Sequence, residues 1–142
     1  MLGDLAALSV AAIVGAAIGA EREYRRHPGG LRSSMLVAAA ACAFARVSVA
    51  HGGASAGAAL GAIATGVGFI GAGVIMRHGA QVRGLSTAAT FWAVAAIGTA
   101  AGLDEFVITG GLTLVVFFAH VALRSLSTWI ERVAPPADDG PR

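Results

Sequence analysis

The sequence of 142 residues has few charges, no lysine and a single cysteine. Only 13% of its residues are charged, about half the usual share in soluble domains. Hydrophobic residues make up 56%, and the mean hydropathy is +0.75. A soluble domain this small could not bury so much apolar surface, so a membrane protein is the first class to test. The formal net charge of +2 is too small to indicate a protein that binds nucleic acid.

The single cysteine, Cys42, excludes a disulfide within the chain. It lies in an apolar run and has no metal-ligand spacing to any histidine, so we interpret it as a small core residue. The histidines are scattered as well, and no pair has the spacing of a metal site. We therefore expect surface or interface histidines, and we expect no cofactor. The four histidines are His27, His51, His78 and His120.

Five apolar runs approach the length at which a helix crosses a ~30 Å hydrocarbon core, roughly 20 residues. Alanine and glycine dominate these runs, which favours helices over the alternating strands of an outer-membrane barrel. We predict an all-α integral membrane protein, a bundle of five transmembrane helices. One transmembrane domain covers 1–125, and a short, disordered cytoplasmic tail covers 126–142. The predicted spans are 2–20, 34–50, 54–76, 85–103 and 106–123.

The basic residues alternate between the predicted loops. Arginines occupy the first loop, the third loop and the tail, whereas the second loop has none and the fourth is acidic. The positive-inside rule then places the N-terminus outside and the C-terminus in the cytoplasm. No basic residue precedes the first run, which we expect to be a retained helix and not a signal peptide. Trp129, just beyond the fifth run, suits an interfacial anchor.

Arg46 is the exception to this alternation, because it lies near the outer end of the second predicted helix. Two interpretations are open. The side chain either snorkels outward to the interface, or it pairs with Asp4, Asp104 or Glu105 at the same face.

The third run contains a GxGxxG pattern, in TGVGFIGAGVIMRHG. A dinucleotide-binding turn needs an acidic residue about 20 positions later, and Phe91 stands there, so we reject that interpretation. Close packing of helices is preferred, because lipid gives helices no hydrophobic reason to associate. Close packing through these glycines would suit a third helix at the centre of the bundle. The alternative is a bent or loosened helix that lines an ion site. The glycines predicted to pack helices are Gly15, Gly19, Gly66, Gly68, Gly71, Gly73, Gly98 and Gly102, and Gly53, Gly57 and Gly61 share the same small-residue spacing.

Polar residues gather at the predicted cytoplasmic ends of the helices. Pro28-Gly29-Gly30 turns the chain, Ser33 or Ser34 is expected to cap the second helix, and Ser86 or Thr87 the fourth. This predicted polar cluster comprises Glu21, Arg22, Glu23, Arg32, Arg77, Arg83, Thr87 and Thr90.

Three interpretations of the cluster compete. In the first, arginines mark the topology and glutamates pair with them. In the second, Glu21 and Glu23, with Thr87 and Thr90, form a vestibule open to cations, because Mg²⁺ takes hard oxygen ligands. The two glutamates are then the candidate metal ligands, although four nearby arginines oppose a cation. In the third, the arginines hold anionic lipid head groups.

Two long stretches, GAAIGAERE–RRHPGGLRSSMLVA and TGVGFIGAGVIMRHGAQVRGLSTAATFWAVAAIGTAAGL, resemble the MgtC/SapB family of bacterial membrane proteins. The resemblance covers about residues 12–103. The acidic-basic step of the family falls on Glu21, Arg22 and Glu23, and the arginine of its GLR turn on Arg32. Its glycine-rich helix falls on Gly66, Gly68, Gly71 and Gly73, and its VRGL-x-TAAT turn on Arg83, Gly84, Leu85, Thr87 and Thr90.

The resemblance implies a multi-pass protein of the bacterial inner membrane, linked to growth at low magnesium and to survival inside host cells. Members were first regarded as Mg²⁺ transporters, but the better-studied ones resemble regulators, one of which acts on the F-type ATP synthase. The sequence departs from the family where HGGASAGAALGAIATG replaces an Asp-Pro-x-Arg step and a glutamine. We also expect the short, membrane-only form of the family, without the soluble C-terminal domain of the virulence members.

Two functional hypotheses follow. The first is a regulatory protein that acts on magnesium homeostasis or membrane energetics through helix contacts. Its expected partners are the bilayer, another membrane protein or a second copy, and no nucleic acid. The second is a transporter of Mg²⁺ or another small ion, weakened by the lack of a carboxylate near the bilayer midplane. We expect no enzyme, because no nucleophile–base pair or metal cluster is found.

Overall fold

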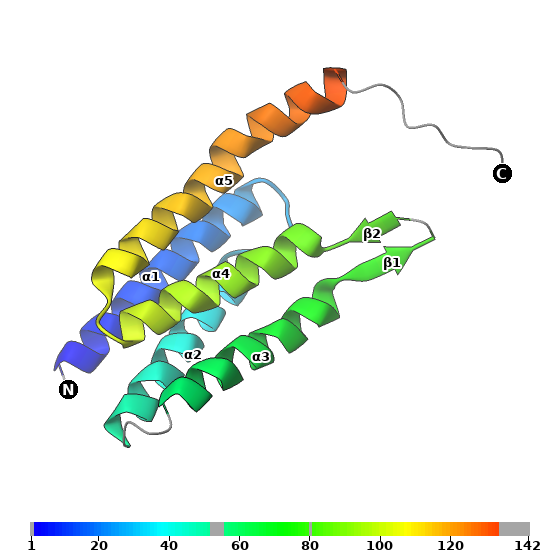
Figure 1. Ribbon diagram of the computed structural model, residues 1–142. Coiled ribbons are helices and arrows are strands. Elements are labelled where there is room, and N and C mark those ends of the chain that lie inside the picture. The colour runs from blue at the N-terminus through cyan, green and yellow to red at the C-terminus, as the bar shows by residue number, and fades with distance from the viewer. Residues whose placement is uncertain (1, 52–55, 80, 134–142) are drawn as a thin grey trace.

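The computed structural model describes residues 2–51, 56–79 and 81–133, and within them five α-helices pack into one bundle (Figure 1). All five are long and apolar enough to cross a membrane. The predicted helical membrane protein with five spans is therefore confirmed, although the orientation of its termini stays a prediction. The helices are α1 (Leu2–Tyr24), α2 (Leu31–Ala50), α3 (Ala56–Val74), α4 (Leu85–Gly102) and α5 (Phe106–Val133).

The helix boundaries differ most from the prediction in α5. Its candidate span ends at Leu123, as predicted, but the helix itself continues to Val133. The residues 126–133 are therefore helical and not disordered, while 134–142 lie outside the described residues. The sequence between Leu123 and Pro135 contains no glycine or proline, so nothing in it breaks the helix. Trp129, the predicted interfacial anchor, lies exposed on this extension.

A β-hairpin, which the sequence analysis missed, connects α3 to α4. Strand β1 (Met76–His78) pairs with β2 (Gln81–Arg83) in antiparallel register, and the hairpin projects beyond both helices (Figure 1). For this reason α3 ends at Val74, before the predicted end of its span. A glycine at the tight turn, Gly79, adopts the left-handed conformation with φ of +62°. That glycine between two short extended segments is the signal that could have revealed the hairpin.

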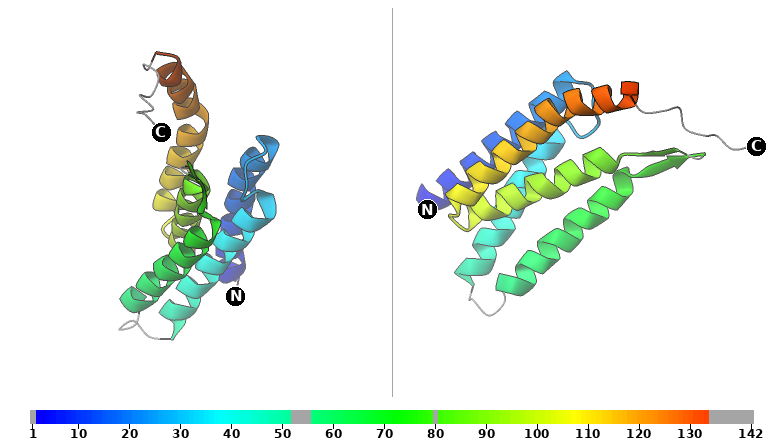
Figure 2. Two further views of the ribbon diagram at one scale, coloured as in Figure 1. Left: turned by 90° about the vertical axis from the view of Figure 1, so that its right-hand side faces the viewer. Right: turned by 45° about the horizontal axis from the view of Figure 1, so that its top comes forward.

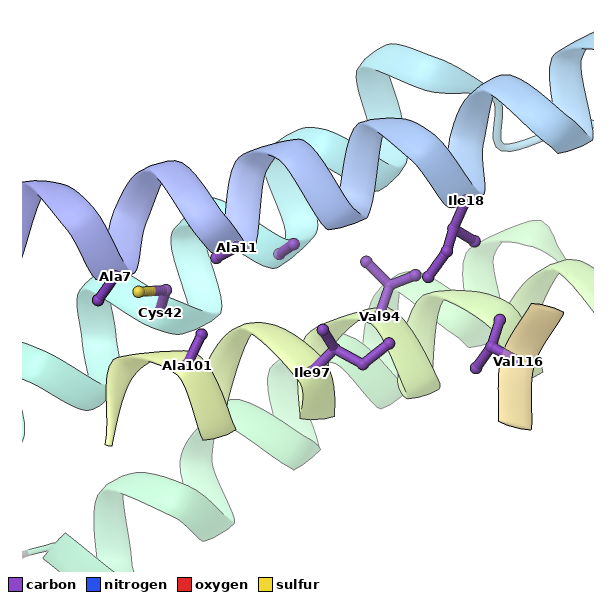
Figure 3. Close-up of a cluster of buried hydrophobic side chains, with 9 residues drawn as sticks. Ala7, Ala11, Ile18, Cys42, Val94, Ile97, Ala101 and Val116 are labelled. Carbon is purple, nitrogen blue, oxygen red and sulfur yellow. The ribbon is translucent and has the colours of Figure 1, made fainter. Parts of the chain in front are cut away.

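Helix α4 forms the centre of the bundle. It contacts each of the other four helices, and 56% of its span is buried, against 11% for α3 and for α5. Figure 2 shows α3 at the edge of the bundle, so the expected central position of the third helix is wrong. The core joins α4 to α1, α2 and α5 and includes Cys42, as predicted (Figure 3). The residues of this core are Ala7, Ala11, Ile18, Ala38, Cys42, Val94, Ile97, Ala101 and Val116.

Four of the predicted packing glycines bring α1, α2 and α4 into close contact. A Cβ atom on Gly98 would lie 2.1 Å from the carbonyl oxygen of Ala38. One on Gly102 would lie 2.6 Å from that of Cys42. Gly15 and Gly19 of α1 meet α2 and the turn before it in the same way, at 2.7 Å. No larger residue fits at these distances without movement of a neighbour, so glycine allows the helices to meet closely at these four positions.

The glycines of α3 do not pack helices together within this chain. A Cβ atom on Gly66, Gly68 or Gly73 would meet nothing within 4 Å, and the same holds for Gly57 and Gly61. Gly71 alone has a neighbour on another helix, with ordinary contact at 3.4 Å to the Cβ of Ala88. The reason is the position of α3 at the edge of the bundle. The helix is also continuous from Ala56 to Val74, so the broken-helix alternative is not observed, and Gly53 lies outside the described residues.

Arg46 connects three segments at the end of the bundle that holds the N-terminus. Its Nε donates to Asp4 Oδ1 at 3.0 Å, and its Nη1 donates to Asp104 Oδ2 at 2.7 Å. Pairing, and not snorkelling, is therefore the observed alternative. The partners come from the start of α1 and from the turn between α4 and α5.

The contrast between the two kinds of glycine predicts different effects of one added methyl group. Gly98→Ala should lower the free energy of unfolding by about 1–3 kcal/mol, because its Cβ collides with the Ala38 carbonyl. Gly66→Ala is the matched control and should leave stability unchanged or slightly higher. Unfolding of the purified protein in mixed micelles, followed by circular dichroism, measures both. Equal effects would contradict the assigned packing.

Candidate functional site: the buried Arg22 cluster

The densest polar contacts in the described chain centre on Arg22, near the end of α1. Its side chain is buried, with 2% of the residue exposed. Nη1 donates to Thr90 Oγ1 at 2.9 Å, and Nη2 donates to Thr87 Oγ1 and to the Pro28 carbonyl, both at 2.8 Å. A buried charge needs such partners, because removal from water is otherwise unfavourable. One guanidinium therefore joins α1, the turn after it and the first turns of α4.

The start of α4 presents both hydroxyls to Arg22. Thr87 and Thr90 are three residues apart, so they share one helix face, and Thr90 Oγ1 donates to the Ser86 carbonyl at 2.8 Å. Neither Ser86 nor Thr87 caps α4, so this prediction is wrong. The N-cap of α4 is Gly84, with φ of +93° and a backbone so close to α3 that a Cβ would lie 2.0 Å from the Val74 carbonyl oxygen. Only glycine fits this conformation and contact.

The turn between α1 and α2 closes over this site. Gly29 has φ of +77°, and a Cβ there would lie 2.8 Å from Thr87 Cγ2. The N-cap of α2 is Gly30, so the predicted caps by Ser33 or Ser34 are wrong. Instead Glu23 Oε2 accepts the Leu31 N–H at 2.9 Å. A carboxylate from α1 thus satisfies the free N–H of the next helix, which is the task of a capping side chain.

Glu21 and His120 extend the cluster to α5. The Glu21 carboxylate pairs with Arg25 one turn later and lies 3.5 Å from His120 Nδ1. The other ring nitrogen, Nε2, lies 3.1 Å from Thr90 Oγ1. His120 was expected at a surface or interface, and the sequence analysis did not connect it with this site. A lone histidine in an otherwise apolar span was the available signal.

The structure divides the predicted polar cluster into two groups. Glu21, Arg22, Thr87 and Thr90 come together, and His120 joins them. Glu23 turns to α2, while Arg32, Arg77 and Arg83 lie exposed outside the site. We call the five gathered residues, Glu21, Arg22, Thr87, Thr90 and His120, the Arg22 cluster.

The Arg22 cluster differs from the expected cation vestibule in one decisive respect. The guanidinium itself lies between the hydroxyls of Thr87 and Thr90, so a positive charge occupies the place expected for the cation. Nor do the described residues contain a group of three or more His, Cys, Asp or Glu side chains that could hold a metal ion. The arrangement fixes helices to one another.

Comparison with known proteins agrees with the resemblance found in the sequence. The model of the MgtC family matches residues 8–129. The chain belongs to the MgtC family. It is 41% identical to Protein MgtC of Salmonella typhimurium over 131 residues, which is 92% of this chain and 57% of that protein. It is 38% identical to Protein MgtC of Brucella abortus over 127 residues, 89% of this chain and 53% of the relative.

An uncharacterized protein of Synechocystis is similar to the same degree, with 42% identity over 128 residues, 89% of this chain and 55% of that protein. The chain therefore spans little more than half the length of these relatives. No solved structure matches the chain. Family membership and five apolar helices together make this a multi-pass membrane protein.

Removal of the central guanidinium should destabilise the bundle. Arg22→Gln leaves two hydroxyls and a carbonyl without their charged donor, and we expect a loss of about 3 kcal/mol in the free energy of unfolding. Arg22→Lys should restore part of it, because an ammonium lacks the fork of the guanidinium. Arg32→Gln, at an exposed position, is the control and should change little. An unaffected Arg22→Gln protein in the same micelle assay would refute this role.

Proposed function

We propose that this chain is a regulatory protein of the bacterial inner membrane, without enzymatic activity, that acts in magnesium homeostasis or membrane energetics. It would do so by contact with another membrane protein through its helices. The observation that carries the proposal is the outer surface of α3, where a small-residue face is left uncovered by the described residues.

That face follows the helical repeat. Gly57, Gly61, Gly68 and Ala72 are exposed, and the spacing of four, seven and four residues puts them on one side of α3. Glycine allows the backbones of two membrane helices to approach closely, which is the main source of their association in lipid. We name these four residues the α3 glycine face.

Grooves on both sides of α3 add to this open surface. One of about 500 Å³ lies between α2 and α3, and its lining includes Phe44 and Gly66. Another of about 300 Å³ lies between α3, α4 and the start of α5, and its lining includes Leu60 and Trp92. A partner helix that packs on the α3 glycine face could therefore insert side chains into the grooves on either side of α3, as in ridge-into-groove packing.

The acidic residues also favour a regulator over a transporter. Each described Asp or Glu that belongs to a candidate span lies within about one helical turn of its end. Transport sites are usually near the bilayer midplane. The alternative of an ion transporter rests on Glu21 and His120, two titratable side chains that are 14% and 18% exposed and face each other.

Flux into proteoliposomes separates the two functions. Vesicles that contain the folded, inserted protein, a trapped Mg²⁺-sensitive dye and an imposed membrane potential should show no flux above protein-free vesicles. Flux that Glu21→Gln abolishes would establish the transporter and overturn the proposal.

The α3 glycine face supplies the positive test. Gly61→Leu and Gly68→Leu should abolish complementation at low magnesium in a bacterial strain that lacks its own family member. Their stability should change by less than about 0.5 kcal/mol, because a Cβ atom at either position would meet no described atom within 4 Å. Ala58→Leu adds the same bulk at an exposed position off this face and should retain function. Full complementation by both glycine variants would exclude the face as a contact surface.

A further inference from the structure

Charge is distributed unevenly between the two ends of the bundle. The end that holds Asp4 and the α4–α5 turn is acidic on balance, with Arg46 opposed by Asp4, Asp104 and Glu105. The end that holds the α1–α2 turn and the hairpin, which we call the basic end, has only Glu21 and Glu23 among its described acidic side chains. Its described arginines are Arg22, Arg25, Arg26, Arg32, Arg77 and Arg83.

The contacts show which of these arginines already have polar partners within the described chain. Arg22 is buried and donates hydrogen bonds through both terminal nitrogens, and Arg25 pairs with Glu21. The remaining carboxylate, Glu23, accepts the N–H of Leu31. Both described carboxylates at this end therefore already have partners within the chain.

Four exposed guanidinium groups are left over. Arg26, Arg32 and Arg83 form no ion pair or hydrogen bond with any side chain that the structure describes. Arg77 donates through Nε to the Gly79 carbonyl at 3.1 Å, which leaves its terminal nitrogens to other partners. We call Arg26, Arg32, Arg77 and Arg83 the basic face.

Apolar side chains are exposed beside these arginines. Tyr24 is 90% exposed at the end of α1. In the hairpin, Met76 lies opposite Arg83 and Val82 lies opposite Arg77, and opposed residues share a side of a sheet. Each side of the hairpin therefore carries one apolar side chain next to one guanidinium. This mixture suits the boundary between hydrocarbon and water, where long basic side chains keep their stems in lipid and their charges at the head groups.

Arg77 and Arg83 of the basic face lie in the hairpin, and the position of the hairpin matches that boundary. The candidate spans of α3 and α4 contain 18 residues each, or about 27 Å of helix, close to the thickness of the hydrocarbon core. The hairpin begins two residues after α3 ends and projects past both helices (Figure 1). Its arginines thus stand just beyond the apolar spans, at the depth of the lipid phosphates.

We propose that Arg26, Arg32, Arg77 and Arg83 form a binding surface for the head groups of anionic phospholipids in the leaflet at this end of the bundle. The guanidinium fork matches a phosphate with two parallel hydrogen bonds. Each basic residue beside an anionic membrane surface strengthens the attraction about fivefold. The exposed apolar neighbours favour lipid over a phosphate free in water, because they remain in contact with the acyl region when the head group is bound.

Quenching of tryptophan by brominated lipids tests this surface on the full chain. Trp92 and Trp129 are both exposed and report which lipids surround the helices. The protein is reconstituted in phosphatidylcholine, and brominated phosphatidylglycerol is titrated in; the reverse exchange with brominated phosphatidylcholine gives the relative binding constant. The wild type should prefer the anionic lipid at least fivefold, and high salt should reduce the preference.

The decisive comparison is between variants. Arg26→Gln, Arg32→Gln, Arg77→Gln and Arg83→Gln combined should bring the ratio close to one. Arg25→Gln is the matched control for each single variant: it removes one positive charge from the same end of the bundle, but from an arginine that pairs with Glu21, and it should keep the wild-type ratio. If the fourfold variant does not fold, judged by circular dichroism, the single variants Arg32→Gln and Arg83→Gln should each lower the ratio by a factor of two or more.

Three results would overturn the proposal. The first is a wild-type ratio of one. The second is an equal loss in Arg25→Gln and in the basic-face variants, which would indicate net charge and not a defined surface. The third is loss of the wild-type preference when inorganic phosphate is added at constant ionic strength, which would assign the arginines to a soluble anion.

Discussion

The guanidinium of Arg22 is the contact on which the arrangement of the described chain depends. It is a charge buried among hydroxyls and a carbonyl, so it is stable only when all three segments around it are in place. These segments are the end of α1, the turn before α2 and the start of α4. The position of α4 at the centre of the bundle therefore follows at one end from a polar contact, and along the rest of its length from apolar packing.

Close approach of backbones provides that second part. Lipid offers no hydrophobic gain for the association of apolar helices, so contact area between them has to supply it. Gly98 and Gly102 allow the backbone of α4 to approach that of α2, and Gly15 allows α1 to approach the same helix. The buried side chains between them are small, mostly alanine and valine, which keeps the helix axes near one another. The peripheral helices α3 and α5 are held less extensively, and only 11% of each candidate span is buried.

The two ends of the bundle use their charges differently. Arg46 forms ion pairs with Asp4 and Asp104, and this network connects α1, α2 and the α4–α5 turn. At the basic end the two glutamates are already engaged by the fold, so most arginines face outward. The family model and the relatives named Protein MgtC show that the chain belongs to the MgtC family. The regulatory role, the partner and the lipid preference are proposals drawn from the exposed surfaces.

Sequence alone determined the elements whose physics is local. Hydropathy and length predicted the five helices, and the spacing of Gly15, Gly19, Gly98 and Gly102 predicted where helices meet. The glycines of α3 have the same spacing, but apart from Gly71 a Cβ atom there would meet nothing within 4 Å in the described chain. In water, an apolar stripe identifies the buried face, but in lipid both the buried and the exposed faces are apolar, so the pattern cannot separate them.

Only the tertiary structure decided which polar residues meet. Glu21, His120 and the neighbouring pair Thr87 and Thr90 belong to three helices that are far apart along the chain, and from the sequence the carboxylates and hydroxyls were interpreted as a cation site. The fold instead places Arg22 between the hydroxyls, because burial of that charge requires every acceptor within reach. The sequence shows which polar residues are present and in which order. Which of them fills the space between α1 and α4 depends on how the helices pack.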